Sequence, residues 1–261
     1  MNDYFKITKL NNKTRIDDVT LIISTSSIPS HPDNSIIKSA IENTYKINYD
    51  FYDVIIAYDK PKKNNANYNR YIDNMMNEYP NYKHIRISKH GHFIGNMYNA
   101  LKHCKTKYFL VVQHDIKLVG NFPVKEVLNY KFDWNIIATH HKKEGLHEAT
   151  HWFPIIENYN KSLLKTYGWS ERIFMGKTQF FIDKIYEIDK NNLSNKFIES
   201  VFHKQFTKLF KKLDNINSYK YLNPYSKNRK IYDKYWNDWK CFNLKSHICY
   251  HEHLHGRTKN N

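Results

Sequence analysis

Short apolar, β-branched runs alternate with amphipathic stretches through the first half of the chain, and this alternation restricts the fold more than any other feature. The runs are at 19–24, 53–59, 83–88, 108–112 and 135–139, and the stretches at 34–44, 67–78 and 95–103 carry apolar residues at helical spacing. Strands that alternate with helices are typical of βαβ units around a mostly parallel sheet. We therefore expect an α/β fold whose first 115 residues form a nucleotide-binding half-sheet.

Polar side chains stand where three of these runs end. Thr25 follows the first run, Asp59 closes the second, and Gln113, His114 and Asp115 follow the fourth. The carboxyl ends of parallel strands meet at one edge of a sheet, where ligands bind. Asp59 is placed to accept hydrogen bonds from a base or ribose, the alternative being a simple turn residue. Asp115 is a candidate ligand for Mg²⁺ or Mn²⁺ with help from a distant side chain, the alternative being a turn cap or a lysine partner.

Composition adds broad limits. The 41 Lys and Arg against 25 Asp and Glu give a net charge of +16, which attracts polyanions, nucleotide phosphates or anionic membranes. No run approaches the roughly 20 apolar residues of a membrane span, the N-terminus lacks the apolar core of a signal peptide, and three scattered cysteines suit a reducing compartment. We expect one cytoplasmic domain over 1–261, with a nucleotide-binding half at 19–139, an acceptor-side half at 140–216 and a C-terminal appendage at 217–261.

The order of the motifs resembles that of the GT-A glycosyltransferases, in particular the family 2-like enzymes. The matching pieces, within 20–210, are IISTSSIPSHP, VIIAYD, ISKHGHFIGNMYNAL and KYFLVVQHD, and the Lys and Asn bias is similar to that of transferases of large DNA viruses. The resemblance implies a Rossmann-like GT-A fold, a UDP- or GDP-sugar donor, and a glycan or other hydroxyl acceptor. Gln113 departs from the family's DxD pattern, whose first position is acidic, and adds no charge there.

The resemblance also implies roles for individual residues. Mn²⁺ or Mg²⁺ would be held by Asp115 together with His251 or His255, from the C-terminal segment YHEHLHGR, whose alternating histidines would share one face of an extended strand. The alternatives for this cluster are a three-histidine zinc site and a solvated tail. The nucleotide-sugar-binding residues would be Thr25, Ser27, Asp59, Lys89, Asn96, Gln113, His114 and Arg257.

Inverting sugar transfer needs a base that takes the acceptor hydroxyl proton while the diphosphate leaving group is neutralised. We favour Glu199, in a segment that looks like the family's ED region, over Glu171 and Glu148. Trp169 and Trp152 are the candidates for stacking on an acceptor sugar.

Two other functions compete with this interpretation. A nucleotidyltransferase would share the half-sheet but normally carries a glycine-rich, basic phosphate loop after the first strand, and 24–30 contains neither glycine nor lysine. A nucleic-acid-binding protein is supported by the charge and by aromatic and basic residues interleaved at 219–221 and 232–240, yet no recognised binding motif is present, so we expect no specific nucleic acid partner. The basic tail also suits an anionic membrane surface.

Overall fold

A computed structural model of the chain describes residues 14–26, 34–45, 49–61, 66–141, 155–169, 172–188, 208, 211–212, 228–245 and 248–254. Its helices are α1 (Ser35–Tyr45), α2 (Ala66–Glu78), α3 (His92–Lys102), α4 (Val124–Leu128), α6 (Thr178–Ile188) and α8 (Arg229–Trp239). Its strands are β1 (Thr14–Ser26), β2 (Tyr49–Asp59), β3 (Lys83–Arg86), β4 (Tyr108–Gln113), β5 (Ile116–Gly120), β6 (Ile136–Ala138), β7 (His140–His141), β8 (Ile155–Asn158), β9 (Leu163–Thr166), β10 (Ile173–Lys177), β11 (Cys241–Leu244) and β12 (Cys249–His253).

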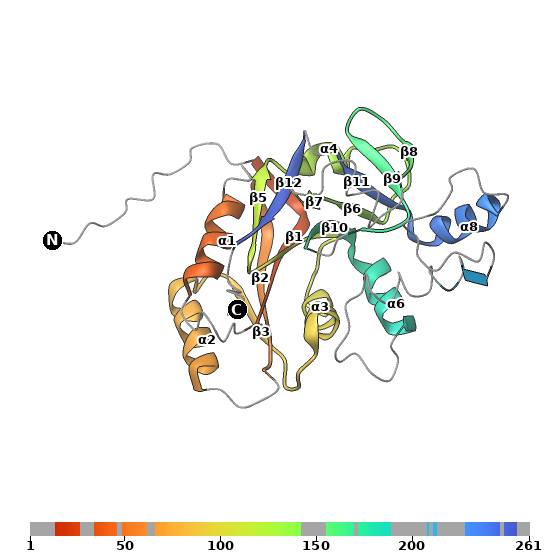
Figure 1. The fold of residues 1–261 in the computed structure, drawn as a ribbon. Helices are drawn as coiled ribbons and strands as arrows, with labels where there is room; N and C mark the ends of the chain where they lie inside the picture. Colours follow the sequence, from red (N-terminus) through yellow and green to blue (C-terminus); the bar gives the residue numbers. More distant parts are fainter. Residues whose placement is uncertain are drawn as a thin grey trace, which may run out of the picture.

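A large central sheet organises the fold (Figure 1). Among the described residues it has nine strands in the order β3-β2-β1-β4-β10-β6-β11-β9-β8. β3, β2, β1 and β4 are parallel neighbours, whereas β10 runs antiparallel to both β4 and β6. The predicted α/β architecture, with a parallel half-sheet built from the first part of the chain, is confirmed. The segment expected as an appendage contributes β11 to the interior of this sheet, between β6 and β9.

Helices cover both faces of the parallel half-sheet, with α1 and α2 on one side and α3 and α6 on the other (Figure 1). Successive strand residues point to opposite faces, so Leu21 and Ile23 join the core beneath α1 and α2 while Ile22 joins the core beneath α3 and α6. Burial on both faces explains why the strand sequences read as continuous apolar runs. The alternation of such runs with amphipathic stretches therefore predicted this half of the fold.

A second, smaller sheet places the C-terminal segment next to the end of β4. Its strand order is β5-β12-β7, with β12 antiparallel to β5 and parallel to β7. This pairing brings residues 249–254 alongside the turn that contains Asp115. In the part of the chain that the structure describes, no helix has the length and apolarity that crossing a membrane requires.

Candidate functional site

The carboxyl ends of β1, β2 and β4 lie at the same edge of the sheet, with β4 ending two residues short of the other two. Ser26 of β1 stands opposite Asp59 of β2, and Ser24 of β1 stands opposite Gln113 of β4. Since β1 lies between the other two strands, the ends of β2 and β4 are two strand spacings, about 10 Å, apart. Asp59 and the Gln113-His114-Asp115 segment therefore meet at one edge of the sheet, as the sequence predicted.

Asp59 is nearly buried and is held by the loop that precedes α3. Its Oδ1 accepts the Gly91 backbone N–H at 2.9 Å, and its Oδ2 lies 3.2 Å from Nδ1 of His90. Burial raises the pKa of the Asp59 carboxyl, and the hydrogen bond from Gly91 and the neighbouring charges of His90 and His92 partly offset that rise.

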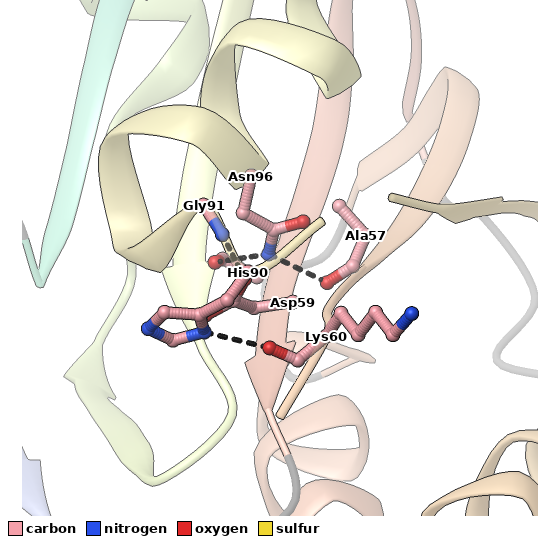
Figure 2. Close-up of polar contacts among 7 residues, drawn as sticks. Ala57, Asp59, Lys60, His90, Gly91 and Asn96 are labelled. Carbon is pink, nitrogen blue, oxygen red and sulfur yellow. Dashed lines mark hydrogen bonds and ion pairs between the residues drawn. The ribbon is translucent and has the colours of Figure 1, made fainter. Parts of the chain in front are cut away.

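His90 is oriented by two acceptors. Its Nδ1 lies 2.6 Å from the Lys60 carbonyl oxygen, as Figure 2 shows, and also faces Asp59. A carbonyl oxygen only accepts, so Nδ1 carries a proton. Within the described residues Nε2 is buried and has no hydrogen-bond partner. Buried polar atoms are normally paired, so this atom is an exception among the described residues.

Close packing fixes the start of α3 beside these side chains. A Cβ on Gly91 would lie 3.0 Å from both the Gly95 Cα and the Ile87 Cδ1, so only glycine fits without a shift. His92, the first residue of the helix, has a left-handed backbone with φ of 52°. The sequence segment SKHGHFIG therefore forms a tight entry to α3 that positions Asp59 and His90.

Asn96 and Thr25, two of the predicted nucleotide-binding residues, hold the strand ends together. The Asn96 Nδ2 donates to the Ala57 carbonyl at 2.8 Å and to Ser24 Oγ at 3.0 Å, so it ties α3 to β2 and β1 (Figure 2). Its side chain is 1% exposed. The Thr25 hydroxyl is equally buried and lies 2.6 Å from the Tyr71 hydroxyl on α2. Both residues lie at the predicted edge, with protein atoms as partners.

Three backbone hydrogen bonds hold the Gln113-His114-Asp115 segment in place. The Gln113 N–H donates to the Arg172 carbonyl at 3.2 Å, and the His114 N–H donates to the Ser24 carbonyl at 2.9 Å. The Leu254 N–H donates to the Asp115 carbonyl at 2.8 Å. The C-terminal segment therefore reaches Asp115, the neighbour that the sequence predicted for it.

His251, a predicted metal ligand, is fully buried and is committed to other partners. Its Nδ1 lies 2.7 Å from Thr139 Oγ1, and its Nε2 lies 3.4 Å from the Arg172 guanidinium. His251 stands opposite Leu118, three residues beyond Asp115 along β5, which is about 10 Å away. The metal-binding role of His251 therefore stays a prediction, and both of its ring nitrogens have protein partners in this structure. No cluster of three or more metal-ligating side chains occurs among the described residues.

Trp169 lies in the core rather than at an exposed surface. It was expected to stack on an acceptor sugar, but it is 0% exposed, and its ring packs among Phe174, Phe181 and Trp239. Its faces are covered by protein, because an indole at this position completes the core beneath α6.

Lys89, a predicted nucleotide-sugar-binding residue, is exposed on the loop between β3 and α3, beside His90.

Several predicted residues lie outside the described part of the chain, so their roles stay predictions. These are Ser27, Glu148, Trp152, Glu171, Glu199, His255 and Arg257.

The site includes two residues that the sequence interpretation did not single out. His90 lies beside Asp59, and Arg172 lies beside Gln113. His90 stands in the segment KHGH, where two histidines flank a glycine at the start of a predicted helix, and that signal was readable. Arg172 had no local signal, since its position depends on β10 pairing with β4.

No protein-family model and no curated protein sequence matches the chain. Among solved structures, the mannosyltransferase PcManGT from Pyrobaculum calidifontis, in complex with GDP-Man and Mn²⁺, is similar with 9% identity, a TM-score of 0.48 and coverage of 74% of this chain and 52% of that one. TarS 1-349 from S. aureus has 13% identity, a TM-score of 0.48 and coverage of 73% and 55%. HddC from Yersinia pseudotuberculosis has 13% identity, a TM-score of 0.44 and coverage of 63% and 79%. The chain thus spans about half the length of the first two.

Proposed function

We propose that the protein is a glycosyltransferase that moves a sugar from a nucleoside-diphosphate sugar to an acceptor hydroxyl. The observation that supports the proposal is the parallel pairing of β1 with β2 and β4, so that Asp59 and the turn after β4, which contains Asp115, lie at one sheet edge. In open α/β sheets this edge is where nucleotides bind, with an acid after the second strand on the ribose or base. The pair Asp59 and His90 would bind the nucleoside, and the Asp115 end would face the diphosphate.

The reaction needs one proton transfer and one displacement. The acceptor oxygen forms a bond to the anomeric carbon, the bond from that carbon to the diphosphate oxygen breaks, and the acceptor proton moves to a carboxylate. Glu199 is our first choice for that base and Glu171 the second, and inversion at the anomeric carbon is the outcome we propose. Trp152 remains a candidate for acceptor stacking.

A divalent ion fits this site only if the protein and the substrate share its coordination. Asp115 supplies one hard carboxylate, and Mg²⁺ and Mn²⁺ are commonly held by one or two carboxylates plus substrate phosphates. Asp115, together with His251 or His255, would hold the ion, which would supply charge neutralisation of the leaving diphosphate. The Asp115 carboxylate, through the ion, and the cationic side chains nearby would together orient that diphosphate.

Nucleotide-dependent thermal stabilisation tests the proposal. The full chain is heated with UDP, GDP and their sugar conjugates, with and without Mn²⁺, and we expect one nucleotide series to raise Tm, because a ligand that binds only the folded state stabilises it. Asp115→Ala should abolish the Mn²⁺-dependent part of that shift. Asp73→Ala, which removes an exposed carboxylate on α2, is the matched control. If no nucleotide raises Tm, the transferase proposal is rejected, and salt-sensitive oligonucleotide binding in its place would favour the nucleic-acid alternative.

A further inference from the structure

Tyr68 lies in the first turn of α2, close to the carboxyl edge of the central sheet. It is three residues before Tyr71, whose hydroxyl lies 2.6 Å from Thr25 Oγ1 near the end of β1. Because α2 connects the carboxyl end of β2 to the start of β3, its first turn is the part nearest that edge. Three helical residues span about 4.5 Å, which places Tyr68 about one strand residue further out than Thr25, level with Asp59.

The fold does not use the hydroxyl of Tyr68. The residue is 7% exposed, and none of the described residues hydrogen-bonds its hydroxyl. That hydroxyl is not one of the fully enclosed polar atoms, so it reaches the surface. The two other buried tyrosines of the same core do have partners. Tyr71 contacts Thr25, and the Tyr58 hydroxyl lies 2.9 Å from Nδ1 of His84. Buried tyrosine hydroxyls usually find a partner, so a phenol here, where a phenyl ring would fill the core equally well, indicates a ligand.

Asp59 and Tyr68 approach the end of β2 from opposite faces of the sheet. Asp59 accepts the Gly91 N–H ahead of α3, whereas Tyr68 packs in the core beneath α1 and α2. Burial raises the pKa of the Tyr68 phenol, and the negative charge of Asp59 raises it further, so the phenol stays protonated at neutral pH. A hydrogen-bond donor with no protein partner therefore lies beside the acid at the proposed nucleoside site.

We propose that Tyr68 is a nucleoside-binding residue whose hydroxyl donates a hydrogen bond to an oxygen of the donor's nucleoside. This inference rests on the function proposed above, because it takes the ligand to be a nucleoside diphosphate. The acceptor is a carbonyl oxygen of the base or a hydroxyl oxygen of the ribose, since both accept from a phenol. The contact adds a residue of α2 to a site otherwise built from strand ends and the α3 entry.

Calorimetric titration of Tyr68→Phe in the full chain tests the inference. The ligands are whichever of UDP or GDP the unaltered protein binds and the matching nucleoside. The substitution removes only the hydroxyl, so we expect both ligands to bind about 3- to 10-fold more weakly, as for the loss of a neutral hydrogen bond. Tyr186→Phe, which changes an exposed tyrosine on α6, is the matched control and should leave both affinities unchanged.

Deoxynucleoside diphosphates identify the acceptor oxygen. If Tyr68 donates to a ribose hydroxyl, the difference between Tyr68→Phe and the unaltered protein disappears for the 2′- or 3′-deoxy ligand that lacks this hydroxyl. If it donates to the base, the difference persists for both deoxy ligands.

The stability of the ligand-free protein separates binding from a structural role. Tyr68→Phe should leave Tm within about 1 °C, whereas Tyr71→Phe, which removes the hydroxyl that contacts Thr25, should lower Tm by about 2–4 °C. A fall in Tm like that of Tyr71→Phe would assign the Tyr68 hydroxyl to the fold and overturn the inference. Unchanged affinity in Tyr68→Phe, or a loss confined to the diphosphate, would overturn it as well. Absence of nucleotide binding by the unaltered protein would instead reject the function on which it rests.

Discussion

The carboxyl group of Asp59 links the proposed nucleoside site to the stability of the fold. Its pKa is raised in the folded protein mainly by burial, so between its unfolded value, about 3.9, and its folded value the native state binds more protons than the unfolded state. Stability contributed by this group is therefore lost as pH rises through that window. As pH rises through this window, we expect the free energy of unfolding of Asp59→Asn to increase relative to that of the unaltered protein. Urea unfolding at a series of pH values from 3.5 upward measures the difference.

Asp73→Asn provides the background for that comparison, because it removes an exposed carboxylate from α2. A stability difference that moves in favour of the unaltered protein as pH rises would mean that Gly91, His92 and His90 outweigh the cost of burying the charge. In that case Asp59 would be a stabilising cap of the α3 entry as well as a ligand group.

Single residues show where sequence reasoning succeeds and where it stops. Asp59 and Asp115 were found because each directly follows an apolar run, and the position of a strand end is a local property. Trp169 was misassigned, because an indole serves equally well as a platform or as core, and only its contacts with Phe181 and Trp239 distinguish the two. His251 was predicted to approach Asp115 but not to contact Arg172, since that contact joins segments distant in sequence.

At the scale of elements, β10 depends on a glycine one residue before its end. A Cβ on Gly176 would lie 2.7 Å from ring atoms of both Phe109 and Phe181. These two rings pack edge to face, with centroids 5.1 Å apart, so neither can move freely. We expect Gly176→Ala to lower the free energy of unfolding by about 1–3 kcal/mol through overpacking, measured by urea denaturation.

A double-mutant cycle supplies the control. Phe181→Leu alone should destabilise the core, but in the Gly176→Ala background it should cost less, because the smaller side chain relieves the clash. Purely additive effects would show that the sheet adjusts elsewhere and that the aromatic contact does not limit residue 176.

Elements with local periodicity were predicted, and elements defined by their partners were not. The strand expected at 83–88 is observed as β3, and the helix expected at 67–78 is observed as α2. Both could be predicted because the periodic spacing of apolar residues is visible within a short stretch of sequence. β5 and β7 are short, and what makes each a strand is its pairing with β12. Such pairings join distant segments, which leaves no signal within a sequence window.

At the scale of the molecule, Asp133 ties three distant segments together. It lies just before β6 and accepts hydrogen bonds from Lys177, at the end of β10, and from Lys240, between α8 and β11. These two bonds lower the pKa of the Asp133 carboxyl, so its contribution to stability is present above the unfolded pKa and is lost as pH falls through the folded one. The side chain is 57% exposed, which limits that contribution to about 0–1 kcal/mol.

We therefore expect Asp133→Asn to lower Tm modestly at pH 7 and to match the unaltered protein once the pH is below the folded pKa of Asp133, measured by calorimetry. Glu187→Gln, which removes an ion pair to Lys184 within α6, is the control, because it connects no distant segments. An equal effect of the two substitutions at pH 7 would argue against a role for Asp133 in holding the segments together.

The insertion of β11 and β12 into the interior of two sheets has a consequence for synthesis. β11 lies between β6 and β9, and β12 lies between β5 and β7, so both fill gaps between strands made much earlier. Until residues 241–244 are made, β6 lacks its partner β11, and until residues 249–253 are made, β5 lacks its partner β12. Such non-local pairing folds slowly, and unpaired edges invite aggregation. These two edges are therefore open to wrong pairing until β11 and β12 have been made.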